Sequence, residues 1–496
     1  MKIIASSILV LFLCSSTMFS QTKNDETIEN VRALISKKQY LNAESLLSNY
    51  YSTHSDDLQT NWLYAQVLHW TNKNDLSEEK FQKAIAIAPK NNAIQLDYAR
   101  MLYESSRFKK VQPLLNNLKE IDDTKAEALL MQANIYFWNG HVNQAKATIN
   151  EIQKLYPDTK ITNELSKSIN DATAPYLKTE FEYQSDNQPL KFFAEKVELG
   201  QYHSWMLSPK LEISNYNFTP SEQALTANIS NKFYFYPIDL SATVAIGVYK
   251  NFSEKTDWIG GIDFNKKIIK NTTFKFGYNK KPYLGTLVST TYNLTQNNVF
   301  GELEYENNKL FSVHAGYNNQ FFSDKNTVQS FSSWLVSKPY KFSDLKIQLG
   351  YGFSYSDAKT NLYTVKQTLN EVIANFNPNK SIDGYYNPYF TPKNQVVNSA
   401  LLLLNYKISN KIDLSAKGNY GFAAKCQNPF IYLNTDSLGN IVFANDSNKV
   451  SFNPFEVSGT LTYSISTNFG VKATYTHQET FFYNRNNINL GLNYRF

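Results

Sequence analysis

The sequence predicts a multidomain α + β chain: an N-terminal α-helical repeat solenoid followed by a C-terminal antiparallel transmembrane β-barrel of about 16 strands. Three observations lead to this fold class. Small and apolar residues recur at intervals of 34 in the first third of the chain. From Pro175 onward, apolar and polar residues alternate instead. The chain is also rich in aromatic residues, with 34 Tyr and 33 Phe among 496 residues, and it is too long for one ordinary domain.

The first twenty residues have the composition of a secretory signal peptide. Lys2 gives a positively charged start, residues 3–13 form an apolar core, and residues 15–20, with four Ser or Thr among the six, supply the cleavage region. The apolar core is too short for a spanning helix, which needs about 20 residues. We therefore expect residues 1–20 to be removed before Gln21 and the chain to be exported.

Residues 21–172 are predicted to form a helical repeat domain. One column of the repeat holds Ala65, Ala99 and Ala133, and a second holds Ala43, Ser77, Val111 and Ala145. Small residues at such positions let paired helices approach and stack into one core. The pattern resembles tetratricopeptide repeats of 34 residues. Four repeats are expected, at about 24–57, 58–91, 92–125 and 126–159, with a capping helix over 162–169. Such a domain either docks a partner or acts as a rigid spacer.

Residues 175–496 are predicted to form the barrel. The alternation in Phe274, Phe276 and Tyr278 is typical of a strand with one apolar and one polar face. A soluble β-sandwich would show the same alternation. Aromatic residues at the ends of segments, a terminal strand ending in Phe496, and short turns alternating with long loops favour a membrane barrel.

The number of strands is predicted to be sixteen. Their expected starts are near residues 177, 192, 206, 222, 240, 256, 272, 297, 309, 327, 345, 396, 412, 454, 468 and 485. Long loops at 357–394 and 425–452 then follow the eleventh and thirteenth strands, on the same side of the membrane. Residues 287–294 are assigned to an external or lumen-folded loop, because an extra strand would make the count odd. A barrel of sixteen strands can leave an aqueous channel.

The sequence predicts no enzyme. The six His residues are scattered, and Cys426 is the one cysteine beyond the signal peptide. Nucleophile-elbow and phosphate-loop motifs are missing. We therefore expect no catalytic residues, no cofactor and no metal. The formal net charge of +6 is spread without a basic run, which argues against nucleic acid as a partner.

Charged and aromatic side chains on the polar faces of strands are the candidates for a lumen wall. Glu180 and Glu182 share one face of the first barrel strand, and Glu302 and Glu304 share one face of the eighth. Rings of charge tune which solute passes a pore. Paired carboxylates also occur in glycosidases, but a wet lumen explains them more simply. Phe300 is expected to face inward, either to stack on sugar rings or to pack against a loop.

Three motifs resemble the outer-membrane subunit encoded by cellulose-synthase operons. They are Ser185-Asp186-Asn187, the segment 278–289 with its Lys280-Lys281-Pro282, and Gly384-Tyr385-Tyr386-Asn387-Pro388, and they occur in the order of that family. The layout is also similar to that of the poly-N-acetylglucosamine export porin. The family has arginines where this chain has Lys280 and Lys281. The resemblance adds Lys280, Tyr385 and Tyr386 to the candidates for a substrate path.

The resemblance implies a porin that exports a cellulose-like or amino-sugar polysaccharide through the barrel lumen. The barrel would lie in outer-membrane lipid, with the repeats in the periplasm. The repeats would dock periplasmic or inner-membrane biosynthesis proteins. Two alternatives are a scaffold or assembly protein whose barrel is plugged by the 357–394 loop, and a general diffusion porin.

Overall fold

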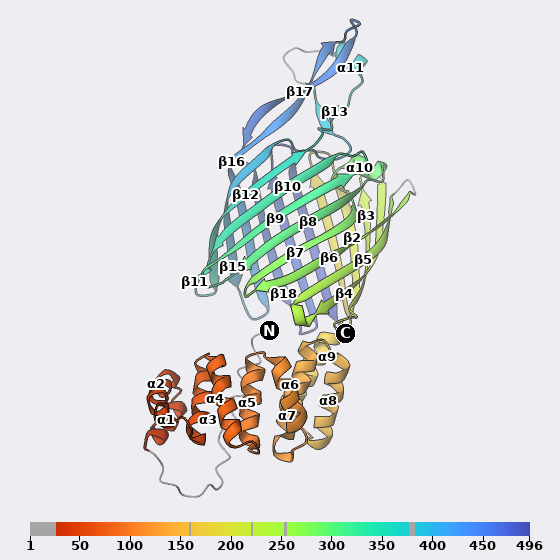
Figure 1. The fold of residues 1–496 in the computed structure, drawn as a ribbon. Helices are drawn as coiled ribbons and strands as arrows, with labels where there is room; N and C mark the ends of the chain where they lie inside the picture. Colours follow the sequence, from red (N-terminus) through yellow and green to blue (C-terminus); the bar gives the residue numbers. More distant parts are fainter. Residues whose placement is uncertain (1–25, 158–159, 220–221, 252–254, 376–381) are drawn as a thin grey trace. The chain divides into compact units, whose positions relative to one another are not determined.

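The computed structural model of the protein describes residues 26–157, 160–219, 222–251, 255–375 and 382–496. It contains two compact units, one made of helices and one made of a β-barrel (Figure 1). The predicted signal peptide lies outside the described residues.

The helical unit follows the predicted repeats. Its helices are α1 (Glu26–Ser36), α2 (Tyr40–Tyr51), α3 (Leu58–Trp70), α4 (Asn74–Ile87), α5 (Asn92–Glu104), α6 (Phe108–Leu118), α7 (Asp122–Trp138), α8 (Val142–Leu155) and α9 (Lys160–Thr173). The predicted capping helix is thus present as α9. None of the helices described is both long and apolar enough to cross a bilayer.

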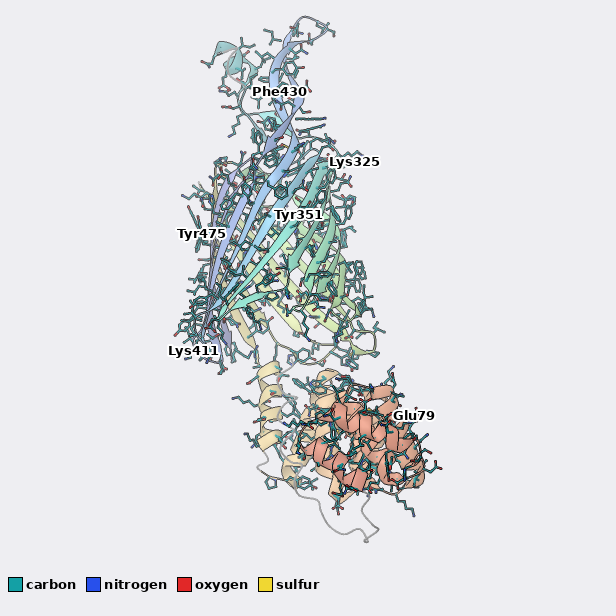
Figure 2. All side chains as sticks on the ribbon, turned by 90° about the vertical axis from the view of Figure 1, so that its left-hand side faces the viewer. Glu79, Lys325, Tyr351, Lys411, Phe430 and Tyr475 are labelled. Atoms are coloured by element: carbon teal, nitrogen blue, oxygen red, sulfur yellow. The ribbon has the colours of Figure 1, made fainter. Side chains whose placement is uncertain are left out.

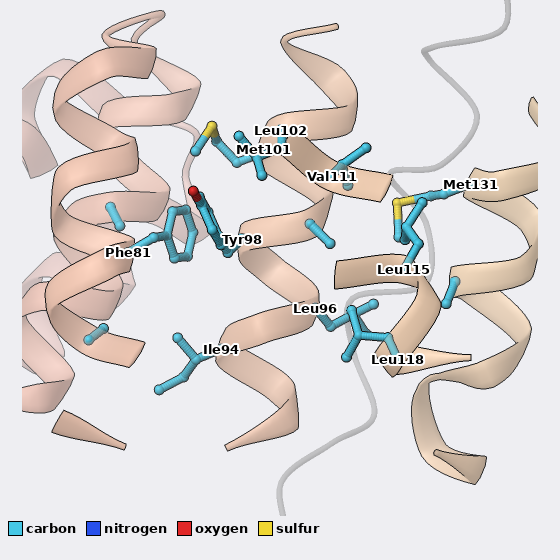
Figure 3. Packing of buried hydrophobic residues seen from close by; sticks show 14 of the residues in the cluster. Phe81, Ile94, Leu96, Tyr98, Met101, Leu102, Val111, Leu115, Leu118 and Met131 are labelled. Atoms are coloured by element: carbon cyan, nitrogen blue, oxygen red, sulfur yellow. The ribbon is translucent and has the colours of Figure 1, made fainter. Parts of the chain in front are cut away.

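The two predicted columns of small residues lie between stacked helices. Ala65, Ala99 and Ala133 are fully buried, as are Ala43, Ser77, Val111 and Ala145. Ser77 is tolerated there because its hydroxyl donates to the Ala65 carbonyl at 2.7 Å. Larger side chains such as Phe81, Met101 and Leu115 fill the space between successive repeats, as Figure 3 shows. Each helix pair therefore buries its apolar surface against the next pair.

The turn between the two helices of each repeat has one residue in the left-handed region. These residues are Lys38, Asn72, Ser106 and Gly140, with φ of 57°, 64°, 61° and 77°. They are spaced 34 residues apart, so the backbone repeats as regularly as the core. Gly140 alone of the four adopts this conformation without a steric cost, because it has no Cβ.

The second unit is built from long antiparallel strands. The barrel strands are β1 (Tyr176–Asp186), β2 (Lys191–Gly200), β3 (Pro209–Phe218), β4 (Glu222–Phe235), β5 (Leu240–Asn251), β6 (Thr256–Ile269), β7 (Thr272–Pro282), β8 (Thr295–Glu306), β9 (Phe311–Phe322), β10 (Thr327–Ser337), β12 (Leu345–Ala358), β15 (Gln395–Lys407), β16 (Ile412–Thr435), β18 (Phe455–Ser464), β19 (Phe469–Glu479) and β20 (Asn484–Arg495). This confirms a barrel of sixteen strands, and each begins within three residues of its predicted start.

The barrel closes where β1 pairs with β20. Tyr176 lies opposite Arg495, and the ladder continues in register to Asp186 opposite Arg485. Each of the sixteen barrel strands is also paired with its neighbour along the barrel, so the described wall closes on itself. A closed barrel satisfies every backbone group of the strands, as a membrane requires.

The outward face of the strands carries a band of exposed apolar side chains. It includes Phe181, Val197, Ile213, Ile229, Ile246, Ile262, Phe276, Val299, Leu303, Tyr317, Leu335, Leu349, Leu402, Leu461 and Leu490. Aromatic side chains flank the band at both ends; Tyr406, Tyr463 and Tyr494 lie at one end and Tyr183, Phe193 and Phe321 at the other. This distribution is that of an outer-membrane barrel in contact with lipid.

The two ends of the barrel differ. At one end, which we call the turn end, short connections such as 270–271 and 408–411 join the strands. Strand β1 begins and strand β20 ends at this same end. At the loop end, residues 283–294 contain the short helix α10 (Leu287–Thr291), so the prediction of a loop rather than a strand there is confirmed. The long loop after β12 holds the small strands β13 (Tyr363–Val365) and β14 (Gly384–Tyr386) and the helix α11 (Leu369–Ala374).

The predicted long loop over 425–452 has a regular structure. Strand β16 runs on past the barrel wall to Thr435, and β17 (Ile441–Phe452) pairs with this extension from Ala424 opposite Phe452 to Thr435 opposite Ile441. β-Branched and aromatic residues such as Phe430, Ile431 and Tyr432 favour a strand. The segment therefore forms a two-stranded arm (Figure 1). A three-residue strand, β11 (Tyr340–Phe342), adds a hairpin at the turn end.

We expect Ser106→Gly to stabilise the helical unit by about 0.5–1 kcal/mol, because glycine adopts the positive φ without a Cβ penalty. Thermal melts of the intact protein followed by circular dichroism at 222 nm would measure it. The control is Ser52→Gly, at an exposed position with a φ of −56°, which should destabilise instead. Equal effects at the two sites would contradict the argument.

We expect Ile246→Arg to destabilise the barrel in lipid by about 2–4 kcal/mol, since it places a charge on the outward face. Thr243→Arg is the matched control, because Thr243 lies on the inward face of the same strand opposite Asp263. Urea unfolding in lipid vesicles would compare the two variants. A Thr243→Arg barrel as unstable as Ile246→Arg would show that the faces are assigned wrongly.

Candidate functional site

The inward face of the barrel is polar along most of its length. The cross-strand register decides which residues share it: Glu180 lies opposite Lys196, and Lys196 lies opposite Ser214. Followed strand by strand around the barrel, this face returns to Glu180 through Gly491 on β20. The sixteen strands therefore present one continuous inner wall, which we take as the candidate transport path.

Ion pairs cover the wall formed by β1, β2 and β3. Lys196 lies 2.5 Å from Glu182 and 3.5 Å from Glu180. Nearer the turn end, Glu198 accepts from Lys178 at 2.9 Å and from Lys210 at 3.1 Å. These carboxylates and ammonium groups neutralise one another, so this part of the wall carries little net charge.

A second charged group lies on β7, β8 and β9. Lys275 is 2.8 Å from Glu304 and 3.9 Å from Glu302. His314 lies 3.7 Å from Glu304 and stacks on Trp334, with ring centroids 5.5 Å apart. Glu302, Glu304 and His314 have atoms close enough to surround a cation. The Lys275 ammonium already lies beside both carboxylates, so it offsets part of the negative charge that a metal would need.

Away from the turn end, where Lys346 and Lys407 face inward, the wall formed by β10, β12 and β15 is uncharged and rich in small residues. Its inward positions include Ser330, Ser332, Ser354, Ser356, Ser399, Gly350 and Gly352, beside the larger Trp334, Leu401 and Leu403. Across β18, β19 and β20 the inward residues include Thr460, Thr474, Thr476, Asn487 and Asn489. The path is thus bordered by hydroxyl and amide groups on one side and by paired charges on the other.

At the loop end the inner wall becomes apolar. Phe192, Phe218 and Ile259 point inward and are buried, and Leu284 and Leu287 of the 283–294 loop pack against them. Because apolar side chains on a barrel's inner wall would otherwise meet water, this loop covers them. The loop therefore folds into the lumen. This was one of the two predicted possibilities, the other being an external loop.

Tyr389, in the long loop after β12, is fully buried at the same end. Its ring stacks on Phe322 of β9 with centroids 3.6 Å apart, and its hydroxyl donates to both carboxylate oxygens of Asp324, at 2.8 and 3.0 Å. Burial first, and then this hydrogen bond, raise the pKa of the Tyr389 phenol, so it remains a neutral donor at physiological pH.

Neighbouring residues of this loop reach two other parts of the mouth. The backbone N–H of Phe390 donates to the Tyr283 hydroxyl at 3.1 Å, which ties it to the β7–β8 loop. The Phe390 ring also lies 5.0 Å from Phe482 in the β19–β20 turn, and Tyr386 lies 5.9 Å from the same ring. These two connections are on opposite sides of the barrel, eight strands apart in either direction. Residues 386–390 therefore cross the mouth.

The charges at the two ends are unequal. At the turn end, cationic side chains without an ion pair are Lys232, Lys266, Lys267, Lys270, Lys309, Lys338, Lys341, Lys346, Lys407, Lys411, Lys472 and Arg495, within the ranges the structure describes. Carboxylates there without an ion pair are Asp239, Glu306, Asp344 and Asp413. At the loop end the two signs are interspersed, and ion pairs join Arg485 to Asp186 and Lys393 to Asp357. Figure 2 shows Lys411 at the turn end and Lys325 at the loop end.

Most of the residues predicted for the path lie along it. Glu180, Glu182, Glu302 and Glu304 are on the inward face, as is Phe300, which lies opposite Gly277. Their part in transport remains a prediction.

The prediction that Lys280 faces the lumen is wrong. It pairs with Gly260 on the outward face, near the loop end, and its ammonium lies 2.8 Å from Asp257 and 4.5 Å from the centre of the Trp258 ring. Its neighbour Lys281 takes the inward position, opposite Gln296. Consecutive residues of a strand point to opposite faces, so one of the two lysines must face outward. The Lys280-Lys281 motif alone could not show which of them lines the path.

Tyr385 and Tyr386 lie in β14, in the long loop rather than on the barrel wall. Tyr386 is buried against Tyr363, Phe390 and Phe482. Tyr283, Phe322 and Tyr389 hold the loops together and were not among the predicted residues. Apolar residues at inward positions of strand ends, such as Phe192, were the signal that could have indicated a covered mouth.

Comparisons with known proteins give similarity of fold. No protein-family model matches the chain, and no curated protein matches it. Among solved structures, one described as a bacterial polysaccharide outer membrane secretin is 8% identical, with a TM-score of 0.46, and covers 66% of this chain and 99% of its own. A loop-deletion mutant of OmpT, an outer membrane protein of Vibrio cholerae, is 10% identical, with a TM-score of 0.30, over 65% of this chain and 98% of its own.

The helical unit has its own similar structures. A tetratricopeptide repeat protein from Parabacteroides merdae is 10% identical, with a TM-score of 0.27, over 29% of this chain and 56% of its own. At these identities and TM-scores, none of the three identifies what this chain transports or binds.

We expect Tyr389→Ala to raise the conductance of the barrel in planar bilayers, because it removes both the stack on Phe322 and the hydrogen bond to Asp324. Tyr389→Phe keeps the ring and should change conductance less. Tyr292→Ala is the control, since Tyr292 is 61% exposed in the neighbouring loop. If Tyr389→Ala conducts no more than the wild type, these loops do not close the path.

Proposed function

We propose that this chain is an outer-membrane porin through which a secreted exopolysaccharide leaves the cell. In this proposal the signal peptide directs export, the turn end of the barrel faces the periplasm, and the helical repeats lie there and dock biosynthesis proteins. The observation that carries the proposal is the continuous polar inner wall of a closed barrel of sixteen strands, a size that can enclose an aqueous channel.

The chemistry of the wall suits a sugar polymer. Serine, threonine and asparagine side chains, such as Ser332, Thr474 and Asn489, can exchange hydrogen bonds with sugar hydroxyls along the path. Binding of this kind is weak and repeated at many sites, which lets a solute enter and leave. The three motifs shared with the outer-membrane subunit of cellulose-synthase operons point to the same cargo class, a cellulose-like or amino-sugar polymer.

The proposal is for a passive conduit and not for an enzyme. Glu302 and Glu304 would be the natural acid–base pair for glycoside hydrolysis, but both face the Lys275 ammonium. Synthesis elsewhere would then supply the force that moves the polymer.

The covered mouth favours a second candidate, a scaffold whose barrel stays plugged. Residues 386–390 and the 283–294 loop close the loop end through buried aromatic contacts. If that closure is permanent, nothing passes, and the repeats alone would carry the function by holding envelope proteins at the outer membrane.

Deletion of the gene tests the first candidate. We expect the deletion strain to lose cell-surface polysaccharide and to regain it on complementation with the wild-type chain, because the polymer then has its conduit back. Quantitative sugar analysis of the cell surface and of periplasmic extracts would measure it. A chain with the destabilising Ile246→Arg serves as a control, and it should restore less surface polysaccharide than the wild type does.

Two results separate the candidates. Unchanged surface polysaccharide in the deletion strain, with a silent barrel even for Tyr389→Ala, would exclude the conduit. Stable periplasmic partners recovered with the full chain would then support the scaffold. A barrel that passes small solutes and is blocked by no glycan would instead indicate a diffusion porin.

A further inference from the structure

The turn end of the lumen carries an excess of positive charge on its inner wall. Five lysines there lie on the inward face: Lys232 on β4, Lys267 on β6, Lys346 on β12, Lys407 on β15 and Lys472 on β19. All five are exposed, and their strands are distributed around the circumference. We call this set the lysine ring.

Carboxylates offset the lysine ring only in part. Lys267 shares a hollow with Glu304 and Glu306, and Lys407 lies opposite Asp413. By contrast, Lys232 lies opposite Thr243, and Lys472 lies opposite Gly491. Across the described part of the barrel, no carboxylate lies within 4 Å of any of the five ammonium groups.

Lys346 adds an independent observation. Its other cross-strand partner is Lys341, on β11, so two ammonium groups are placed directly opposite each other on one face. Such a like-charge pair is destabilising unless an anion lies between or near the two groups. Deeper in the lumen the charges behave differently, since Lys196 and Lys275 are matched by carboxylates.

We infer that the lysine ring is an entrance for an anionic solute, and that the exported polymer carries acidic substituents, carboxylate or similar groups, on its cellulose-like or amino-sugar backbone. This rests on the proposed export function and gives its cargo a charge. Rings of lysine or arginine select anions in pores, and a cationic opening raises the local concentration of an anionic chain. The polymer would meet the ring before it reaches the neutral wall of serine and threonine.

A lipid phosphate is the other anion that such lysines could meet. The five side chains of the ring face the lumen and not the outward apolar band, so lipid headgroups do not reach them from the bilayer. Cations in the turns themselves, such as Lys270 and Lys411, are the ones placed to contact headgroups. The inference therefore assigns the ring to the polymer, and the experiment separates the two.

The test is binding of short oligosaccharides to the full-length protein in detergent, measured by calorimetry at about 50 mM salt. Tetragalacturonate is the acidic probe, and cellotetraose is the neutral one. We expect the acidic probe to bind from the turn end and the neutral probe to bind at least about tenfold more weakly. Raising the salt to about 300 mM should weaken the acidic probe, because salt screens exposed charges.

A variant with Lys341→Gln, Lys346→Gln, Lys407→Gln and Lys472→Gln should bind tetragalacturonate about tenfold more weakly, since it keeps polar side chains and removes their charge. The control changes four exposed lysines at the loop end to Gln: Lys325, Lys359, Lys366 and Lys449. It should bind as the wild type does. Circular dichroism would confirm that both variants are folded.

Equal binding of the two probes, or wild-type binding by the ring variant, would overturn the inference. The inference would also be overturned if the ring variant bound tetragalacturonate as the wild type does but bound less tightly to phosphatidylglycerol vesicles. That result would assign the lysines to lipid. The outcome is independent of the export assay. If deletion abolishes surface polysaccharide but the protein shows no preference for the acidic probe, only the acidic cargo is rejected. If the protein prefers the acidic probe but deletion leaves surface polysaccharide unchanged, only the export role is rejected.

Discussion

The pairing of β1 with β20 is the interaction on which the barrel depends. It joins Tyr176–Asp186 to Asn484–Arg495, segments almost three hundred residues apart, and leaves no strand edge unpaired. In hydrocarbon each unpaired backbone group would cost several kcal/mol, so an open sheet could not stay there. Once the sheet is closed, the pleat gives every strand residue one of two environments, lipid or lumen.

That division explains why the inner wall has three zones. In the middle, charges such as Lys196 and Glu182 meet their partners across the strands, and the desolvation of each is offset by the other. At the loop end, apolar side chains face inward and are buried by infolded loops. At the turn end, lysines remain without matching carboxylates. A path with paired charges inside and unpaired charges at one opening attracts a charged chain without holding it throughout.

The helical unit reaches its stability by repetition. Ala65, Ala99 and Ala133 occupy the same place in successive repeats and are fully buried, so each helix pair sits at the same distance from the next. The left-handed turn residues recur with the same spacing, and three of the four are not glycine. The regular packing of the repeats compensates the small backbone cost at Lys38, Asn72 and Ser106.

The sequence by itself determined the strand count, the strand starts, the repeat columns and the face of Glu180 or Glu302, because periods of 2 and 34 are local properties of the chain. It did not determine the contacts of the long loop. Tyr389 finds Phe322 and Asp324, and Phe390 finds Tyr283 and Phe482, only after closure of the barrel brings distant loops to one rim. Such loops have no period to read, so their partners are chosen by the tertiary structure. The same holds for the lysine ring, whose members are far apart in sequence and become neighbours because sixteen strands close into one wall.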